Sequence, residues 1–294
     1  MSALTNRRLS RLLPLSGRWV AWINLFASLT TLALAVGAFL SLRGPSWATF
    51  LAIWICILLA ISWIALFVQQ RTYDRSARYA KATTNVHDAF HYLRDATLAI
   101  VKDPRNSEGF SPPLEQSATE LAAAFSIVTG VKCRLCIKQM NVYQSDEDPR
   151  RTGEAGLRDM VVRDVARSRG TWSRPHMEPD YVSDNTDFEL ILVREQRYFF
   201  SNDLRRETPY KNSHWDDTIV ANRQYEYLST IVWPIRRQIH DPSSRTRYRL
   251  LGFLCVDSLI PGVFDIETDF GLGAAYADTL FSLLSPLMDE EKKE

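Results

Sequence analysis

The sequence predicts an α+β protein with an N-terminal transmembrane helical hairpin, a long connector helix, and a domain whose antiparallel sheet is flanked by helices. Two apolar stretches near the N-terminus are almost free of charge, and the next segment keeps a helical repeat without Pro or Gly. In the remainder of the chain the predicted elements follow the order helix, strand, helix, strands, helix. This order is typical of one sheet covered by helices. We expect a basic cytoplasmic N-terminus over 1–18, the hairpin over 19–68, the connector over 69–103 and the domain over 110–290.

The hairpin prediction rests on length and on missing charge. From residue 20 to residue 68 the only formal charge is Arg43, which lies in a short turn. Segments 19–42 and 47–68 are each long enough, at about 1.5 Å per helical residue, to cross a hydrocarbon core of roughly 30 Å. Both are too long for the apolar region of a cleaved signal peptide, which spans about 7–15 residues.

Basic residues flank the hairpin on both sides. They are Arg7, Arg8, Arg11 and Arg18 before it, and Arg71, Arg75, Arg78 and Lys81 after it. Because basic residues favour the cytoplasmic side, we expect a two-pass protein of the inner (plasma) membrane with both termini in the cytoplasm. The lipid bilayer is therefore the first expected partner.

The part after residue 68 has the composition of an ordinary soluble domain. Residues 1–68 hold five arginines and no Lys, Asp or Glu, so the remainder carries 30 basic and 34 acidic side chains. This balance gives no electrostatic footprint for nucleic acid. Four cysteines without a paired framework fit a reducing compartment.

The connector carries a heptad-like seam. Its apolar or small positions step by four and three residues: Tyr79, Thr83, Val86, Phe90, Leu93, Thr97 and Ile100. Such a repeat predicts a parallel homodimer with Val86, Phe90, Leu93 and Ile100 at the contact. The alternative is a helix that packs only on its own domain.

Sequence patterns also predict the elements of the domain. A helix over 112–129 follows the possible N-cap Ser111 and ends at Gly130. A period-two strand over 131–138 comes next, with Val131, Cys133, Leu135 and Ile137 on its buried face. The remaining predictions are a helix over 156–168, strands over 189–193, 198–201, 227–235 and 248–257, and a final helix over 270–288.

Four motifs in this domain resemble those of GAF domains, in the same order. Gly153-Glu-Ala-Gly-Leu leads to Gly170, like the family's "G-x-x-G-hydrophobic … G" segment, and Phe200-Ser-Asn-Asp-Leu resembles its strand-to-loop step. Ser229-Thr-Ile-Val-Trp-Pro-Ile resembles its "S-hydrophobic-x-x-P" strand. Leu250-Leu-Gly-Phe-Leu, followed by Phe264 and the last helix, is similar to its closing strand and helix.

The resemblance implies a cytosolic small-ligand or signalling module that is usually dimeric through flanking helices. It names no ligand and no cofactor. The Asp-Glu pair of the cyclic-nucleotide subtype is missing after Phe264, and no cysteine between Cys136 and Cys255 could attach a bilin.

Aromatic and polar residues in the segment that covers one sheet face in this fold make a candidate ligand pocket. They are Trp172, Asp203, Arg206, Tyr210, Trp215, Tyr225 and Ser229. Apolar walls with a few polar groups are what ligand sites require. Half-buried aromatics in long loops are the alternative interpretation.

No catalytic or metal site is predicted. Cys133 and Cys136 lie three apart in a strand, so their sulfurs point to opposite faces, and one is expected in the core and one at the surface. His87 and His91 have the spacing of a metal clamp, but no further ligand cluster accompanies them. We expect a protein that is not an enzyme.

Two functions fit these observations. The first is a membrane-anchored sensor or regulator that binds a small molecule or partner and signals through the paired helix to a downstream protein. The second is a ligand-activated effector whose hairpin clusters and permeabilises the membrane.

Overall fold

The computed structural model describes residues 32, 36–37, 45–103, 106–141, 160–170, 180–207, 210–215, 217–222, 225–239 and 248–291. The helices are α2 (Pro45–Lys102), α3 (Ser107–Thr129), α5 (Thr186–Val193), α6 (Asp217–Asn222) and α7 (Ile266–Glu291), with short 3-10 turns η1 (Val182–Asp184) and η2 (Leu204–Arg206). The strands are β1 (Cys133–Asn141), β2 (Val161–Arg167), β3 (Asp180–Tyr181), β4 (Phe199–Ser201), β5 (Ser229–Gln238) and β6 (Tyr248–Ser258).

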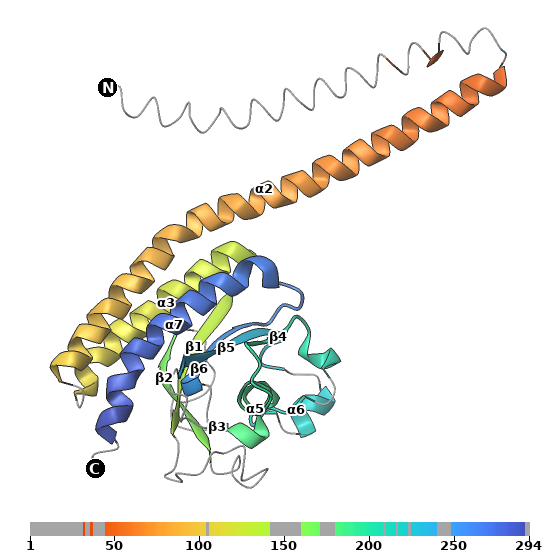
Figure 1. Cartoon of the computed structure of the whole chain (residues 1–294). Helices are drawn as coiled ribbons and strands as arrows, with labels where there is room; N and C mark the ends of the chain where they lie inside the picture. Colours follow the sequence, from red (N-terminus) through yellow and green to blue (C-terminus); the bar gives the residue numbers. More distant parts are fainter. Residues whose placement is uncertain are drawn as a thin grey trace, which may run out of the picture. The chain divides into compact units, whose positions relative to one another are not determined.

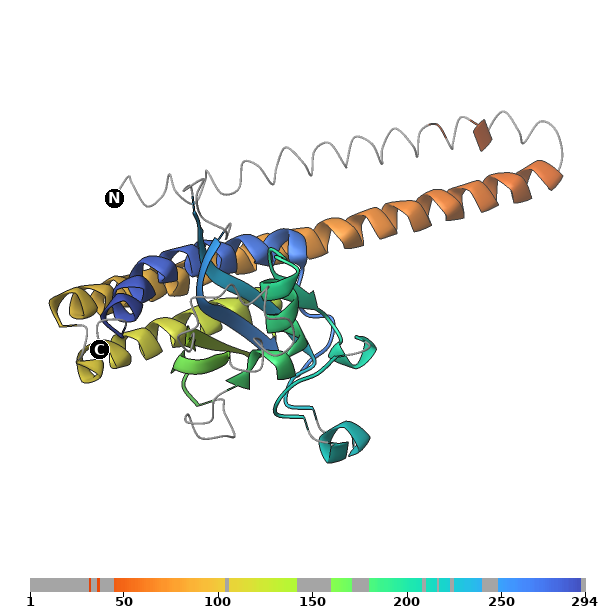
Figure 2. The same cartoon turned by 60° about the horizontal axis from the view of Figure 1, so that its bottom comes forward.

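The six strands form one sheet in the order β3-β2-β1-β6-β5-β4, and every neighbouring pair is antiparallel. Helices α3 and α7, with the part of α2 from Arg75 onward, cover one face, which we call the helix face (Figure 1). Helix α5 lies over the other face, which we call the site face (Figure 2). The predicted α+β class with a helix-flanked antiparallel sheet is confirmed.

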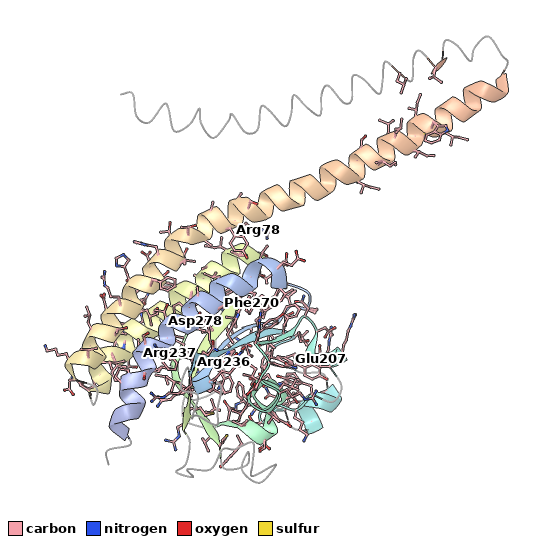
Figure 3. All side chains as sticks on the ribbon, in the orientation of Figure 1. Arg78, Glu207, Arg236, Arg237, Phe270 and Asp278 are labelled. Carbon is pink, nitrogen blue, oxygen red and sulfur yellow. The ribbon has the colours of Figure 1, made fainter. Side chains whose placement is uncertain are left out.

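The helix face holds the larger hydrophobic core. Phe125 of α3 lies 6.0 Å from Trp233 of β5, measured between ring centroids, and Trp233 is also 6.5 Å from Phe270 of α7 (Figure 3). The hydroxyl of Ser117 on α3 donates to the Ala89 carbonyl of α2 at 2.5 Å and lies 2.6 Å from the hydroxyl of Tyr276 on α7. One buried serine therefore joins the three helices.

Two glycines are required by close approach. A Cβ at Gly252 of β6 would lie 1.9 Å from the carbonyl oxygen of Lys138 on β1, so only glycine fits between these strands. A Cβ at Gly273 of α7 would lie 2.3 Å from the indole of Trp233. This glycine lets α7 approach the sheet.

The connector is helical, as predicted, within α2. Its seam faces the domain itself: Leu93 and Ile100 are each 1% exposed in the core, and Phe90 packs edge-on against Tyr276 at 5.6 Å. Val86 packs beside Ala82 and Val128 of the α2–α3 contact. Val86, Phe90, Leu93 and Ile100 therefore pack on the domain of the same chain, which is the second of the two interpretations.

Two element predictions are wrong. The helix expected over 156–168 is strand β2 from Val161, whose Val162 packs under the site face while Ala166 packs under the helix face. The strand expected over 189–193 is helix α5, because Phe188 and Ile191, one turn apart, bury the same side. Short apolar runs do not distinguish strand from buried helix by periodicity alone.

The remaining predictions agree with the structure apart from their ends. Helix α3 begins earlier than expected, with the Asn106 side chain accepting the Gly109 backbone N–H, and ends at Gly130, which has a positive φ of 78°. Strands β1, β4, β5 and β6 and helix α7 occupy their predicted segments.

Segment 19–42 lies outside the described residues except for positions 32, 36 and 37, and segment 47–68 lies within the bounds of α2. Among the residues that the structure describes, no helix is both long enough and apolar enough to cross a membrane.

Candidate functional site

A polar row crosses the site face over four strands. The register places Arg134 of β1 opposite Asp257 of β6, Asp257 opposite Thr230 of β5, and Thr230 opposite Ser201 of β4. The Arg134 guanidinium lies 3.7 Å from the Asp257 carboxylate, which also accepts the Thr230 hydroxyl at 2.9 Å. All four side chains are buried. The polar row therefore places one cation, Arg134, and one anion, Asp257, beside the C-terminal end of β6.

A second buried acid faces this row from α5. Asp187 is 4% exposed, and its carboxylate accepts the backbone N–H of Phe188 at 3.0 Å. Desolvation raises the pKa of Asp187 to about 7, and the negative charge of Asp257 adds to the rise. Burial likewise raises the pKa of Asp257, although Arg134 opposes this. Asp187 can therefore gain or lose a proton near neutral pH.

Four aromatic residues lie next to these acids and form what we call the aromatic cluster. The ring of Trp215 is 5.3 Å from Tyr210, 4.7 Å from Tyr225 and 5.6 Å from Tyr227. The Arg134 guanidinium lies 5.7 Å from the centre of the Tyr227 ring, which connects the cluster to the polar row.

The aromatic cluster contains a buried donor without a partner. Among the described residues, the indole N–H of Trp215 has no hydrogen-bond partner. The Tyr227 hydroxyl, by contrast, accepts the Asn212 side-chain amide at 2.6 Å. A buried unpaired donor costs about 1–3 kcal/mol, so such groups mark places where a water or ligand completes the hydrogen bonding.

A charged cluster lies at the other end of the site face, on β1, β2 and β3. Lys138 bridges Asp164, at 2.7 Å, and Asp180. Arg167 also pairs with Asp164, and His214 lies 2.5 Å from Asp180. Burial alone would raise the pKa of both carboxyls, but Lys138 and its neighbours hold them below the usual range. Since its opposite charges are paired internally, the charged cluster fixes β3 and the 212–215 segment to the sheet.

The cysteines of the site face are thiols with raised pKa values. Cys136 and Cys255 are register partners on β1 and β6, and burial raises the pKa of each well above its ordinary value. The Cys136 thiol donates to Asp164 at 2.8 Å. Cys133 is buried on the helix face, so the two sulfurs of the CxxC do point apart. The expectation that one of them is at the surface is wrong, because α5 covers the second face.

The structure brings together three of the seven predicted pocket residues: Tyr210, Trp215 and Tyr225. Trp172 lies outside the described residues. The hydroxyl of Ser229 donates to the backbone carbonyls of Asn202 and Ile260.

The two predicted charged residues belong to a local turn. Asp203 caps η2 by accepting the Arg205 backbone N–H, and its carboxylate pairs with the side chains of Arg205 and Arg206. The Arg206 side chain is 85% exposed. Both residues support the loop after β4.

The residues that the sequence interpretation missed are Arg134, Asp187 and Asp257. A signal for Arg134 was present, because it and Lys138 alternate with apolar residues on the face of β1 that we expected to be solvated. Asp187 gave no such signal, since it precedes the segment 189–193 that was predicted as a strand.

Comparisons with known proteins find similar chains among solved structures. No family model and no curated protein matches the chain. Among solved structures, the chain is similar to the GAF domain of a phosphoenolpyruvate-protein phosphotransferase from Coxiella burnetii, with 13% identity and a TM-score of 0.39 over 71% of this chain and 99% of that one. It is similar to a putative GAF sensor protein from Burkholderia vietnamiensis, with 12% identity and a TM-score of 0.35 over 68% and 93% of the two chains. It is also similar to the free methionine-R-sulfoxide reductase of Neisseria meningitidis, with 13% identity and a TM-score of 0.34 over 63% and 91%. These three structures share no more than 13% identity with this chain, and each has a TM-score below 0.4.

Proposed function

We propose that this chain is a membrane-anchored regulatory protein whose GAF-like domain binds a small molecule on its site face and passes the change to α2. The observation that carries the proposal is a buried donor left without a partner beside a buried acid. The Trp215 N–H lacks an acceptor among the described residues, and the buried Asp187 has two other carboxyls, Asp257 and Asp180, among its electrostatic neighbours.

A ligand at this place would meet both apolar and polar groups. The aromatic cluster offers ring faces, and Arg134, Asp187 and Asp257 offer charge and hydrogen bonds, as ligand sites require. A ligand bound there would contact one face of β6 and β1. The opposite face of these strands packs against α2, α3 and α7. This gives a physical route from ligand to α2.

The proposed chemistry is binding without turnover. Each thiol of the domain has a raised pKa, so none is poised as a thiolate nucleophile. The carboxylates of the charged cluster are paired with Lys138 and Arg167, and Asp180 also hydrogen-bonds to His214. We therefore expect the residues of the site face to bind a ligand without converting it.

Membrane anchoring is part of the proposal and is supported by α2. Side chains such as Ile53, Leu59, Ile61 and Trp63 are 50% or more exposed on this helix. A helix that is apolar all round is suited to a bilayer or a protein interior. Together with the flanking arginines, this supports a two-pass anchor with the domain in the cytoplasm.

The test is mass spectrometry of small molecules released from the purified full chain in detergent. We expect a molecule that co-purifies with the wild type, and an occupancy about tenfold lower in Trp215→Phe and Asp187→Asn, since each loses a hydrogen bond of about 1–1.5 kcal/mol. Arg206→Ala is the matched control, because its exposed side chain lies outside the aromatic cluster. Equal occupancy in all four proteins, or no retained molecule in the wild type, would overturn the proposal.

A further inference from the structure

Helix α2 carries a second heptad-like stripe, one residue beyond the seam that packs on the domain. Its members are exposed or half-buried and step by three and four residues: Ala77, Ala80, Thr84, His87, His91, Arg94, Leu98 and Val101. The side chains of Leu98 and Val101 are 61% and 70% exposed. We call these eight residues the outer stripe.

The outer stripe has the composition of a helix–helix contact. Arg94 is its only charged member, and it pairs with the neighbouring Asp95 of its own helix at 3.2 Å. Charged residues recur every seven positions along one border of the stripe: Lys81, Asp88, Asp95 and Lys102. A weakly charged seam with a charged border is the pattern of a coiled coil.

Two histidines converge in the middle of the outer stripe. The Nε2 atoms of His87 and His91 lie 2.8 Å apart, and the ring centroids are 4.3 Å apart. Two histidines four residues apart on a helix are the arrangement by which zinc is held on helices. With Zn–N distances of about 2.0–2.1 Å, a tetrahedral ion needs Nε2 atoms roughly 3.3 Å apart, so a small rotation of the rings suffices.

One chain gives this pair only half of a closed coordination shell. Structural zinc sites have four protein ligands, and no His, Cys, Asp or Glu of the described residues joins the two histidines in a larger ligand group. Copies anchored in one membrane present α2 in parallel. A two-fold axis along the outer stripe would then place an identical histidine pair opposite the first.

We propose that the outer stripe is the interface with a second copy of this chain, and that His87 and His91 of both copies together bind one divalent metal ion of the zinc class. The shared metal ion would also fix the register of the two parallel helices at the level of the histidines. The small residues of the stripe precede the histidines in sequence, and its apolar residues Leu98 and Val101 follow them.

The test uses the full chain in lipid nanodiscs, purified without a histidine tag. A Leu98→Cys variant in a Cys56→Ser background is treated with a bismaleimide crosslinker, because Cys56 is exposed and the other cysteines are buried. With zinc we expect one metal ion per two chains and about tenfold more crosslinked dimer than with EDTA. His87→Ala and His91→Ala should lose both the metal and the zinc dependence. Tyr92→Phe, an exposed position outside the outer stripe and its charged border, is the control on the same helix and should keep both.

Circular dichroism and thermal unfolding of each variant check that the domain stays folded. One metal ion per monomeric chain, metal binding that survives both histidine substitutions, or crosslinking that is equal in zinc and EDTA would each overturn the proposal. These readouts are independent of the small-molecule site. Trp215→Phe is expected to leave them unchanged, so failure here and failure of the proposed function are distinguishable.

Discussion

Asp187 enters the folded domain with almost all of its surface removed from water and without a cation among its strongest electrostatic neighbours. Its pKa rises from 3.8 to about 7, so the folded state keeps the proton over a range in which the unfolded chain has lost it. The contribution of Asp187 to stability therefore falls between about pH 4 and pH 7 and is level above that, a loss of up to about 4 kcal/mol.

We predict that Asp187→Asn stabilises the protein at pH 8 by about 2–4 kcal/mol and has little effect near pH 4, because the neutral amide is never buried as a charge. Thermal unfolding of both proteins across this range measures the difference. Asp184→Asn, an exposed acid in the preceding turn, is the control and should show no pH-dependent gain. A difference that does not vary with pH would contradict the burial of an uncompensated carboxyl.

At the scale of elements, Gly273 allows α7 to approach Trp233 of the sheet closely. We predict that Gly273→Ala destabilises the domain by about 1–3 kcal/mol, since the added methyl group would overlap the Trp233 ring. Gly271→Ala on the same helix meets nothing within 4 Å and should stabilise by about 0.5–1 kcal/mol through helix propensity. Urea unfolding of the two variants distinguishes packing from propensity. The same sign for both would mean that α7 does not lie against Trp233 as described.

The two faces of α2 are expected to respond differently to truncation. Leu93→Ala should cost about 2–5 kcal/mol of domain stability, because it leaves a cavity among α2, α3 and the sheet. Leu98→Ala, on the outer stripe, should change the free energy of unfolding of the monomeric chain, measured in EDTA, by less than about 0.5 kcal/mol. Denaturation of the two variants provides the check, and equal losses would mean that the seam does not face the domain.

At the scale of the whole molecule, the predicted topology is testable without a structure. Reporter fusions after Glu294 and within the turn at Gly44 should report opposite compartments, with the C-terminal fusion in the cytoplasm, because basic residues flank the hairpin on that side. Removing Arg71, Arg75, Arg78 and Lys81 together should weaken this bias. A C-terminal reporter active only outside the cytoplasm would overturn the orientation.

The sequence determined by itself the elements whose signals are local. Strands β1, β5 and β6 were predictable because apolar and β-branched residues follow a strand pattern over their length, and α3 and α7 because their apolar residues repeat at helical spacing and Gly130 ends the first of them. Three aromatic members of the candidate site were predicted from the resemblance to GAF domains, because in that fold their segment covers one face of the sheet. The identity of β2 and α5 was not, because a short apolar run fits either state until its neighbours are known.

Only the tertiary structure decided which groups meet. Arg134 and Asp257 are far apart in sequence, and the register of β1 against β6 puts them side by side. The raised pKa of Asp187 comes from the burial of this residue of α5 in the folded domain, which no local pattern encodes. A four-three repeat predicts that one face of α2 is buried in a contact, but it does not determine whether that contact is with the domain or with a second chain. The volume between α2, α3 and α7 is filled by Leu93 and Ile100, and this packing leaves the neighbouring outer stripe exposed.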